Sequence, residues 1–212
     1  MSAYIFDFDG TIADSFSLAC RILLNHSDYL GCKQLTSTEL LMLKELHARE
    51  VLKYIGIPFW RIASFVKKIR KMSIGYADQV NVFPEWQTIL SSLNDKKHHV
   101  GLISSNSYQT VEFILDKYKL THLFDFISCE HPLFGKKRVL KKIIRQKNLL
   151  LESTYYIGDE VRDIEAAHAA QIQSIAVGWG FNSSSRLMKA LPHQLILNFD
   201  QLEHVLASHH LE

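Results

Sequence analysis

The sequence predicts an α/β fold, a doubly wound parallel sheet with a Rossmann-like core and an inserted small α-helical cap. Short apolar runs of strand length recur along the chain, and the segments between them have helical length and periodicity. Runs that are apolar throughout are typical of strands buried on both faces of a parallel sheet with right-handed crossovers. This strand pattern disappears between about Ser15 and Gln79, where helical stretches replace it. We therefore predict a core domain of residues 1–14 and 80–212 and a cap domain of residues 15–79.

Five apolar runs are expected to form the core strands. They are Tyr4–Phe6, Val100–Ile103, Phe126–Ile127, Tyr155–Ile157 and Ser174–Val177. Two of the segments between them, Ser107–Lys119 and Lys137–Lys147, carry their apolar side chains on one helical face. Ligands bind outside the carboxyl ends of the strands in such sheets, so the polar residues after each run are candidate site residues.

The predicted cap has helix signals of its own. Thr36 and Glu39 have capping-box spacing ahead of an apolar helical stretch. Gly56-Ile57-Pro58 is a helix stop. These signals favour several short helices in this segment.

The composition is that of an ordinary globular protein with room for one sizeable core and a smaller second domain. The chain has 212 residues, of which 47% are hydrophobic and 22% charged, and a formal net charge of +2. Such a small charge indicates neither a nucleic acid nor an acidic membrane as a partner. No apolar run reaches the roughly 18 residues of a membrane span, and no signal-peptide pattern is visible.

The cysteines support a reducing compartment. Cys20, Cys32 and Cys129 lie far apart without metal-ligand spacing, which fits buried thiols. We therefore expect a cytoplasmic protein. The final Leu211-Glu212 is typical of the residues before a purification tag, so these two residues are not assumed to be native.

The most informative stretch is Asp7-Phe8-Asp9-Gly10-Thr11, directly after the first apolar run. Alternate residues of a strand point to the same side, so Asp7 and Asp9 are expected to share one face. Gly10 permits a sharp turn beside them. The pattern D-x-D-G-T arises by chance about once in a thousand chains of this length. The alternative is a solvated acidic turn at the end of an edge strand.

A second acidic pair follows the run Tyr155–Ile157. Asp159 leads into a good helix former, and Asp163 follows at a spacing that puts both acids on one helical face. A small number of oxygen ligands suits Mg²⁺ better than Zn²⁺, so Asp7 and Asp159 are candidate metal ligands. Alternatively, Asp159 is a helix N-cap and Asp163 a first-turn acid favoured by the helix dipole.

With these motifs the chain resembles the haloacid dehalogenase superfamily, and its cap resembles that of the phosphoglycolate-phosphatase-like branch. The resemblance implies Mg²⁺-dependent hydrolysis of a small-molecule phosphate monoester through an aspartyl-phosphate. It implies that Asp7 is the nucleophile and Asp9 the general acid and base. It also implies that Asp7, the backbone carbonyl of Asp9, and Asp159 bind Mg²⁺, with Asp163 behind them or acting through a water.

The residues after the run Val100–Ile103 are expected to hold the phosphate. Ser104, Ser105 and Asn106 offer hydroxyl groups and free backbone N–H groups at a helix start. Ser104 matches the family's second motif, and Ser105 is the competing register. Thr11 is a further expected substrate contact. The alternative is an ordinary helix N-cap.

Lys136 matches the family's third motif. The lysine of that motif holds the transferring phosphoryl group and offsets the repulsion between carboxylates, so the resemblance implies catalytic and substrate-binding roles for Lys136. Lys137 and Arg138 follow at once, so the sequence leaves this register open. The alternative is a solvated lysine.

The resemblance implies that the cap largely determines substrate specificity. Phosphoglycolate as the substrate is therefore an analogy with that branch. His47, Arg49 and Lys53 are candidate contacts for an anionic group of a small phosphorylated metabolite, and surface positions are the favoured alternative. The sequence does not indicate the oligomeric state.

Two other functions fit the same residues. A sugar phosphomutase uses the same acid pair but returns the phosphoryl group to a sugar hydroxyl. A non-catalytic protein would hold RNA or an acidic partner on the basic helix 136–147. The intact acids argue against the second of these, and the apolar face of that helix makes its charges ordinary amphipathicity.

Overall fold

The computed structural model describes residues 1–129 and 135–208, so Leu211 and Glu212 lie outside it. Its centre is a sheet in the order β5-β4-β1-β6-β7-β8, in which every neighbouring pair is parallel. The strands are β1 (Ala3–Asp7), β4 (His99–Ile103), β5 (Phe126–Ser128), β6 (Thr154–Gly158), β7 (Gln173–Val177) and β8 (Gln194–Ile196). The doubly wound α/β fold predicted from the sequence is confirmed.

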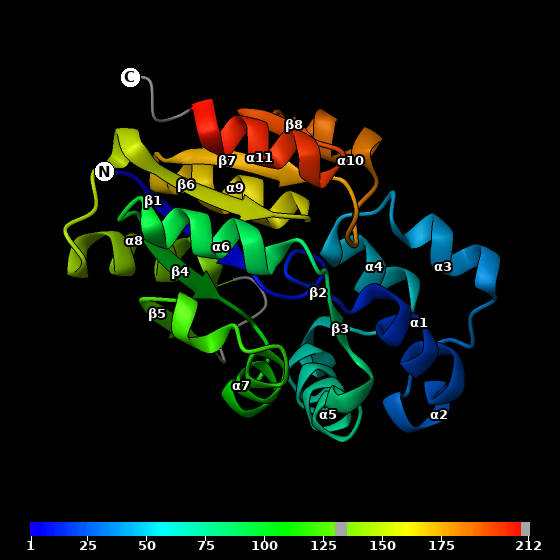
Figure 1. Ribbon diagram of the computed structural model, residues 1–212. Coiled ribbons are helices and arrows are strands. Elements are labelled where there is room, and N and C mark those ends of the chain that lie inside the picture. The colour runs from blue at the N-terminus through cyan, green and yellow to red at the C-terminus, as the bar shows by residue number, and fades with distance from the viewer. Residues whose placement is uncertain (130–134, 209–212) are drawn as a thin grey trace.

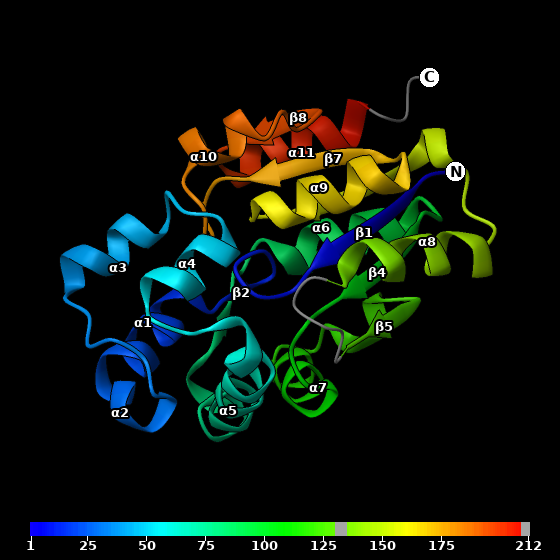
Figure 2. The ribbon, with the colours of Figure 1, turned by 180° about the vertical axis from the view of Figure 1, so that it is seen from behind.

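Helices cover both faces of this sheet (Figures 1 and 2). The helices α6 (Trp86–Asp95), α7 (Tyr108–Lys117) and α11 (Phe199–Ser208) pack on one face, and α8 (Lys136–Gln146), α9 (Val161–Ala170) and α10 (Ser184–Lys189) pack on the other. The side chains of β1 alternate between the layers, because Tyr4 and Phe6 pack with the first group while Ile5 packs with α8 and α9. This two-sided burial explains why the run is apolar throughout.

The segment between β1 and α6 is almost entirely helical and lies beside the carboxyl ends of the strands (Figure 1). It contains α1 (Phe16–Asn25), α2 (Ser27–Leu30), α3 (Ser37–Leu43), α4 (Ala48–Tyr54) and α5 (Ile62–Gly75), with the 3₁₀ turns η1 (Phe59–Arg61) and η2 (Ala77–Gln79). The predicted capping box is present, since Thr36 Oγ1 accepts from the Glu39 N–H at 3.2 Å. Gly56 follows α4 with a φ of +78°, as a helix stop requires.

Both ends of this helical segment pass through one short ribbon. The strand β2 (Ala13–Asp14) enters it and β3 (Asn81–Val82) leaves it, and the two strands pair in an antiparallel manner. A two-stranded connection of this kind is a natural boundary, so we propose that residues 15–79 form a cap domain on a core of residues 1–14 and 80–212. We refer to residues 15–79 as the cap below.

The sequence patterns did not predict β2, β3 or β8. The first two strands contain two residues each, too few to show alternation. The strand β8 lies at the edge of the sheet with only one fully buried residue, Ile196. The 3₁₀ turns η3 (Thr121–Leu123) and η4 (Leu151–Ser153) complete the connections of the core. Within the described part of the chain, no helix combines the length and apolarity needed to cross a bilayer.

Candidate active site

The candidate site lies where the order of the strands reverses. From β1 the chain moves outward to β4 and β5, then returns to the other side of β1 and moves outward again through β6, β7 and β8. Open α/β sheets bind ligands at such a switch point, outside the carboxyl ends of the strands. Asp7 ends β1 and Asp159 follows the last residue of β6, so the topology alone brings these two acids together.

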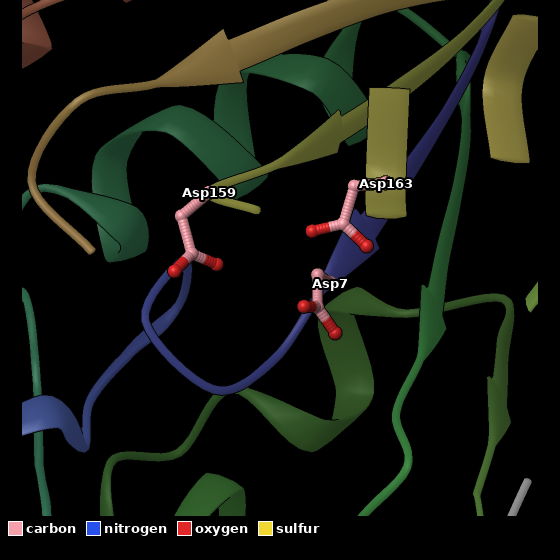
Figure 3. Close-up of side chains that lie close together, drawn as sticks. All are labelled: Asp7, Asp159 and Asp163. Carbon is pink, nitrogen blue, oxygen red and sulfur yellow. The ribbon is translucent and has the colours of Figure 1, made fainter. Parts of the chain in front are cut away.

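Three buried acids form a cluster at this point (Figure 3). One oxygen atom from each of Asp7, Asp159 and Asp163 lies within 4.8 Å of the others. The predicted reason for the closeness of Asp159 and Asp163 is wrong, because α9 begins only at Val161 and Asp159 is not on a helical face. Asp163 lies in the first turn of α9, where its Oδ2 accepts from the Glu160 N–H at 3.0 Å. The β6–α9 loop therefore turns Asp159 toward a helix-borne acid.

The Asp159 carboxylate is fixed by hydrogen bonds to both of its oxygen atoms. Thr11 Oγ1 donates to Oδ1 at 2.8 Å, and the Phe181 N–H donates to Oδ2 at 2.6 Å. A Cβ atom at either Gly10 or Gly180 would collide with this carboxylate, so the two neighbouring loops approach it as only glycine allows. These contacts fix both the position and the orientation of the Asp159 oxygen atoms.

Thr11 therefore has a different contact from the expected one. Its side chain is buried, its hydroxyl donates to Asp159, and its carbonyl oxygen accepts from the indole N–H groups of Trp86 and Trp179 at 3.0 and 3.2 Å. This geometry makes Thr11 an orienting residue for Asp159, and the predicted substrate contact of Thr11 stays a prediction.

Lys136 connects two of the three acids. Its Nζ lies 2.6 Å from both Asp7 Oδ2 and Asp163 Oδ1, and its side chain is 3% exposed. Burial opposes the charged ammonium, but the carboxylates of Asp163 and Asp7 outweigh it and raise the pKa of Lys136. Lys136 is the first residue of α8, whereas Lys137 and Arg138 are exposed. The geometry thus selects Lys136 among the three basic residues that the sequence left in competition.

The cluster fits a hard divalent cation. Three carboxylates face a single ammonium group, which leaves two negative charges without a balancing side chain among these four residues. Burial raises the pKa of Asp7 to about 7, although the positive charges of Lys136 and Arg162 act to lower it. Burial likewise raises the pKa of Asp159. Carboxylate oxygen donors and a deficit of positive charge are what Mg²⁺ requires.

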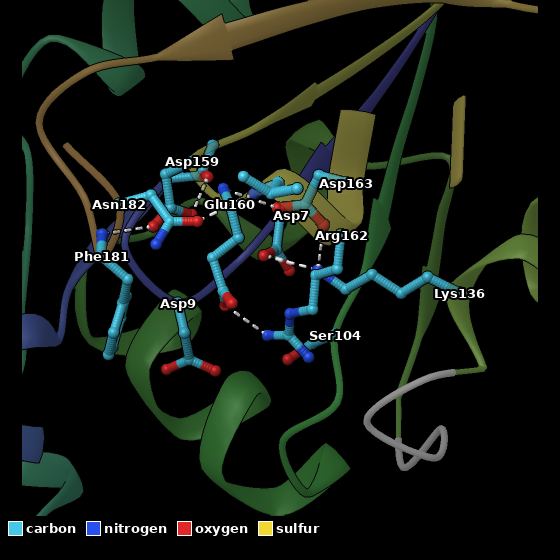
Figure 4. A network of polar contacts seen from close by, with 12 residues as sticks. Asp7, Asp9, Ser104, Lys136, Asp159, Glu160, Arg162, Asp163, Phe181 and Asn182 are labelled. Carbon is cyan, nitrogen blue, oxygen red and sulfur yellow. Dashed lines mark hydrogen bonds and ion pairs between the residues drawn. The ribbon is translucent and has the colours of Figure 1, made fainter. Parts of the chain in front are cut away.

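Asp9 stands apart from this cluster. β1 ends at Asp7, so strand alternation does not set the direction of the Asp9 side chain. Figure 4 shows its carboxylate pointing away from the three acids. Asn106 Nδ2 lies 3.4 and 3.3 Å from its two oxygen atoms, and burial raises its pKa. A carboxyl group with a raised pKa, next to the acidic cluster rather than in it, is suited to proton transfer.

The polar residues 104–106, which follow β4, lie at the same edge of the sheet as the acidic cluster. Asp7, the last residue of β1, pairs with Ile103, the last residue of β4. Ser104 therefore follows β4 at the same edge of the sheet. Ser104 is buried and its Oγ accepts from the Asn106 N–H at 3.0 Å. Ser107, not Ser104 or Ser105, is the N-cap of α7 and accepts from the Thr110 N–H at 3.1 Å. Ser105 and Asn106 instead line a cavity of about 290 Å³ that also reaches Asp9.

The sequence motifs did not identify three further residues of the site. Glu160 and Arg162 occupy the unspecified positions of G-D-x-x-x-D and form an ion pair of 2.5 Å beside Asp7 and Asp9 (Figure 4). Burial disfavours the charged guanidinium, but Glu160 and Asp163 raise the pKa of Arg162.

Asn182 lies in the loop after β7, and its Oδ1 accepts from the Val161 N–H at 2.9 Å. The sequence could have indicated Glu160 and Arg162, because they are an acid and a base inside a recognisable motif. No sequence pattern indicates Asn182 as a site residue.

The cap contacts the core beside this site. The Ser183 N–H donates to the Lys44 carbonyl at 3.0 Å, and Ser185 Oγ donates to Glu45 Oε2 at 2.9 Å. His47 is the N-cap of α4 and its Nε2 lies 3.4 Å from Glu165 of the core.

The three candidate cap contacts lie elsewhere. The residues that line the cavity do not include His47, Arg49 or Lys53, and the last two are exposed. The positions of Arg49 and Lys53 fit the surface alternative, whereas the His47 side chain is only 17% exposed and contacts the core.

The chain is similar to known proteins in both sequence and fold. A sequence model described as haloacid dehalogenase-like hydrolase matches residues 4–177. The phosphoglycolate phosphatase of Synechococcus elongatus is 29% identical over 196 residues, which cover 92% of each chain. A pyrophosphatase of Bacillus mycoides is 20% identical over 214 residues, covering 98% of this chain and 97% of its own length. A solved structure of a predicted phosphatase from Clostridium acetobutylicum shares the fold with a TM-score of 0.80 at 21% identity, covering 98% of this chain and 99% of that one.

Proposed function

The chain belongs to the haloacid dehalogenase-like hydrolase family, and from this premise we propose that it hydrolyses a small phosphate monoester through a phosphorylated Asp7, with Mg²⁺ as cofactor. One observation carries the proposal. Asp7 lies in a buried acidic cluster and contacts Lys136, while the second acid of the same motif, Asp9, is outside that cluster and has a raised pKa. This arrangement separates a nucleophile from a proton donor.

In the first step, a carboxylate oxygen of Asp7 attacks the phosphorus atom. The bond between phosphorus and the ester oxygen breaks, and the leaving oxygen takes a proton from Asp9. Lys136 neutralises charge on the phosphoryl oxygens, and the backbone and side chains of Ser104, Ser105 and Asn106 hold them in place. The products of this step are the free alcohol, an aspartyl-phosphate at Asp7 and an ionised Asp9.

In the second step, a water molecule attacks the phosphorus atom of the aspartyl-phosphate. Asp9, now a base, takes a proton from that water, and the bond between phosphorus and the Asp7 oxygen breaks. Inorganic phosphate leaves, and both acids return to their starting states. The contact between Asp9 and Asn106 supports this role, because it holds the carboxyl group beside the cavity.

Asp7, the backbone carbonyl of Asp9, and Asp159 would hold Mg²⁺, with Asp163 behind them or acting through a water. The bound cation supplies positive charge that balances the acids and the phosphoryl oxygens. The hydrogen bonds from the Thr11 hydroxyl and the Phe181 N–H support this assignment, because they orient the Asp159 oxygen atoms. Lys136 contacts the other two acids instead.

The test measures phosphate release from a panel of phosphate monoesters, with Mg²⁺ or with a chelator. Phosphoglycolate is the first ester to include because of the relative from Synechococcus elongatus. We expect Mg²⁺-dependent release by the wild type, none by Asp7→Asn, and a loss of about 10²- to 10⁴-fold for Asp9→Asn. Mass spectrometry of the protein after rapid quenching should find a phosphoryl adduct on Asp7. Full activity of a folded Asp7→Asn variant would overturn the assignment.

The same experiment addresses the two alternative functions. Addition of a hexose phosphate as acceptor distinguishes a phosphomutase, which would transfer the phosphoryl group to the sugar instead of releasing phosphate. Retention on RNA would favour a binding protein. However, α8 packs Leu140, Ile143 and Ile144 into the core, and its basic residues other than Lys136 form the opposite, exposed face. A cytoplasmic location stays a prediction.

A further inference from the structure

The cavity beside Asp9 extends into the cap. Its volume is about 290 Å³, and its walls come from α1, α3, α4 and α5 on one side. On the other side they come from the loops after β1, β4, β6 and β7 and from α7 and the start of α9. The cap lies beyond the carboxyl end of β1, with α4 beside β2 and α3 at the outer end of the cap (Figures 1 and 2). A volume of this size is near the lower end of the range for ligand pockets. The interior of a protein otherwise has few voids larger than a water molecule.

The cap side of this cavity is lined mostly by hydrocarbon, and Arg70 is the one charged residue among its lining residues. Its wall includes Leu23, Leu43, Val51, Leu52, Phe65 and Ile69. The charged residues of the wall are the acids Asp9 and Glu160 and the cations Arg70 and Arg162. Arg162 already pairs with Glu160 at 2.5 Å. A leaving group with a charged end would therefore bury that charge mainly against apolar side chains, which is costly.

The position of Asp9 fixes what the cavity receives. If Asp7 binds the phosphoryl group and Asp9 protonates the ester oxygen, the rest of the alcohol begins next to Asp9. Asp9 and Asn106 line the cavity and contact each other. The alcohol portion of the substrate therefore points from the polar end of the cavity into its apolar part.

We propose that the substrate is a phosphate monoester whose alcohol portion is largely apolar, an alkyl chain or an aromatic ring, bound in this cavity. The inference rests on the proposed function, because that function sets the positions of the phosphoryl group and of the ester oxygen. It goes beyond that function by naming the chemistry of the leaving group. It also distinguishes this chain from an enzyme selective for phosphoglycolate, whose leaving group carries a carboxylate.

The first test compares kcat/KM for methyl, butyl, hexyl and phenyl phosphate with that for phosphoglycolate and glycerol 3-phosphate. Each buried methylene group is worth about fourfold in binding, so kcat/KM should rise by about that factor per methylene until the cavity is full. Phosphoglycolate turned over as well as hexyl phosphate or better would overturn the proposal, and Arg70 would then be the candidate partner of the carboxylate.

A binding measurement separates this inference from the proposed function. Isothermal titration of the wild type with hexylphosphonate, methylphosphonate and phosphonoacetate needs no turnover. We expect hexylphosphonate to bind most tightly by the same factor per methylene. If no ester is hydrolysed but this order holds, the proposed function fails and the apolar site stands. Equal affinities for the hexyl and methyl compounds would overturn the apolar site.

A matched pair of variants on α1 tests the location. Ala19 lines the cavity, whereas Ser17 is on the same helix, is exposed and does not line it. Ala19→Phe should lower the hexyl-to-methyl ratio of kcat/KM by about tenfold or more, and Ser17→Phe should leave that ratio within about twofold. If Ala19→Phe does not fold, Val66→Phe on α5 fills the cavity from another wall. An unchanged ratio in a folded cavity variant would refute this location.

Discussion

The Asn182 side chain of the core donates from Nδ2 to the backbone carbonyl oxygen of Lys44 in the cap, across 3.2 Å. The same amide donates to the Leu46 carbonyl at 3.1 Å, and its Oδ1 accepts from the Val161 N–H at 2.9 Å. One buried side chain thus joins the loop after α3 to the first residue of α9, the helix that bears Asp163. A single side chain therefore links the cap, through hydrogen bonds, to the helix that carries one acid of the cluster.

We expect Asn182→Ala to lower the free energy of unfolding by about 2 kcal/mol or more, because it leaves buried backbone groups without partners. Ser185→Ala is the matched control, since it removes only exposed contacts with Glu45 and Ser183 and should cost less than about 0.5 kcal/mol. Urea unfolding measures both. Equal losses in the two variants would show that Asn182 has no special place in this contact.

The Thr11 hydroxyl orients a carboxylate of the acidic cluster. Thr11→Val keeps the shape of the side chain but leaves Asp159 Oδ1 without its hydroxyl donor. We expect Mg²⁺ to bind about 10- to 100-fold more weakly to this variant in calorimetric titration, as is typical when a partner of a metal ligand is lost. Thr11→Ser retains the donor and should bind Mg²⁺ within about threefold of the wild type. If the hydroxyl instead contacts substrate, Thr11→Val will change KM without changing the affinity for Mg²⁺.

The sequence predicted the parts of the site that follow from strands and their order. Asp7 ends a run that is apolar throughout, and a parallel sheet places the residue after each such run at one edge, so Asp7, Ser104 and Asp159 were identifiable. The sequence could not show that Thr11 turns its hydroxyl to Asp159 or that Asn182 reaches the cap, because both contacts join segments more than one hundred residues apart. The spacing of Asp159 and Asp163 also led to the wrong prediction that both lie on one helical face. Asp159 lies in the loop before α9, and spacing alone does not distinguish such a loop from a helix.

Mg²⁺ should stabilise the folded protein through the acidic cluster. At a concentration about 100-fold above its dissociation constant, a ligand of the native state adds about 2.7 kcal/mol, or roughly 5–10 °C in Tm for a chain of this length. We expect this shift in thermal unfolding of the wild type and its loss on addition of a chelator. Asp159→Asn should show little shift, while the control Asp200→Asn, at a surface position far along the chain, should retain it. A full shift in Asp159→Asn would place the cation elsewhere.

His193 should make the stability depend on pH. Its Nδ1 accepts from the Ser174 N–H at 3.1 Å, which requires an unprotonated nitrogen. Burial, with His168 nearby, lowers the pKa of His193 below its ordinary value of 6.5. As the pH falls through 6.5, the unfolded state therefore binds the proton more readily than the native state, and stability decreases. His193 is exposed as a whole and only its hydrogen-bonded Nδ1 side is partly buried, so the effect is small.

The measurement compares the Tm of the wild type and His193→Gln between about pH 7.5 and pH 5.5. We expect the wild type to lose roughly 1–3 °C more than the variant over this range. His204 is an exposed histidine on α11, and His204→Gln should follow the wild type. The same loss in His193→Gln as in the wild type would assign the pH dependence to other groups.

The last prediction concerns the balance of charge around Lys136. Removal of this ammonium leaves Asp7 and Asp163 buried against each other, so Lys136→Met should lower the free energy of unfolding by about 3–5 kcal/mol when measured with chelator present. Asp7→Asn removes one of the two opposing carboxylates. In the double variant Lys136→Met/Asp7→Asn, part of the loss should therefore return, giving a coupling of about 1 kcal/mol or more between residues in direct contact. Exact additivity in this cycle would mean that Lys136 does not serve to balance Asp7, and its position 2.6 Å from both acids would then need another explanation.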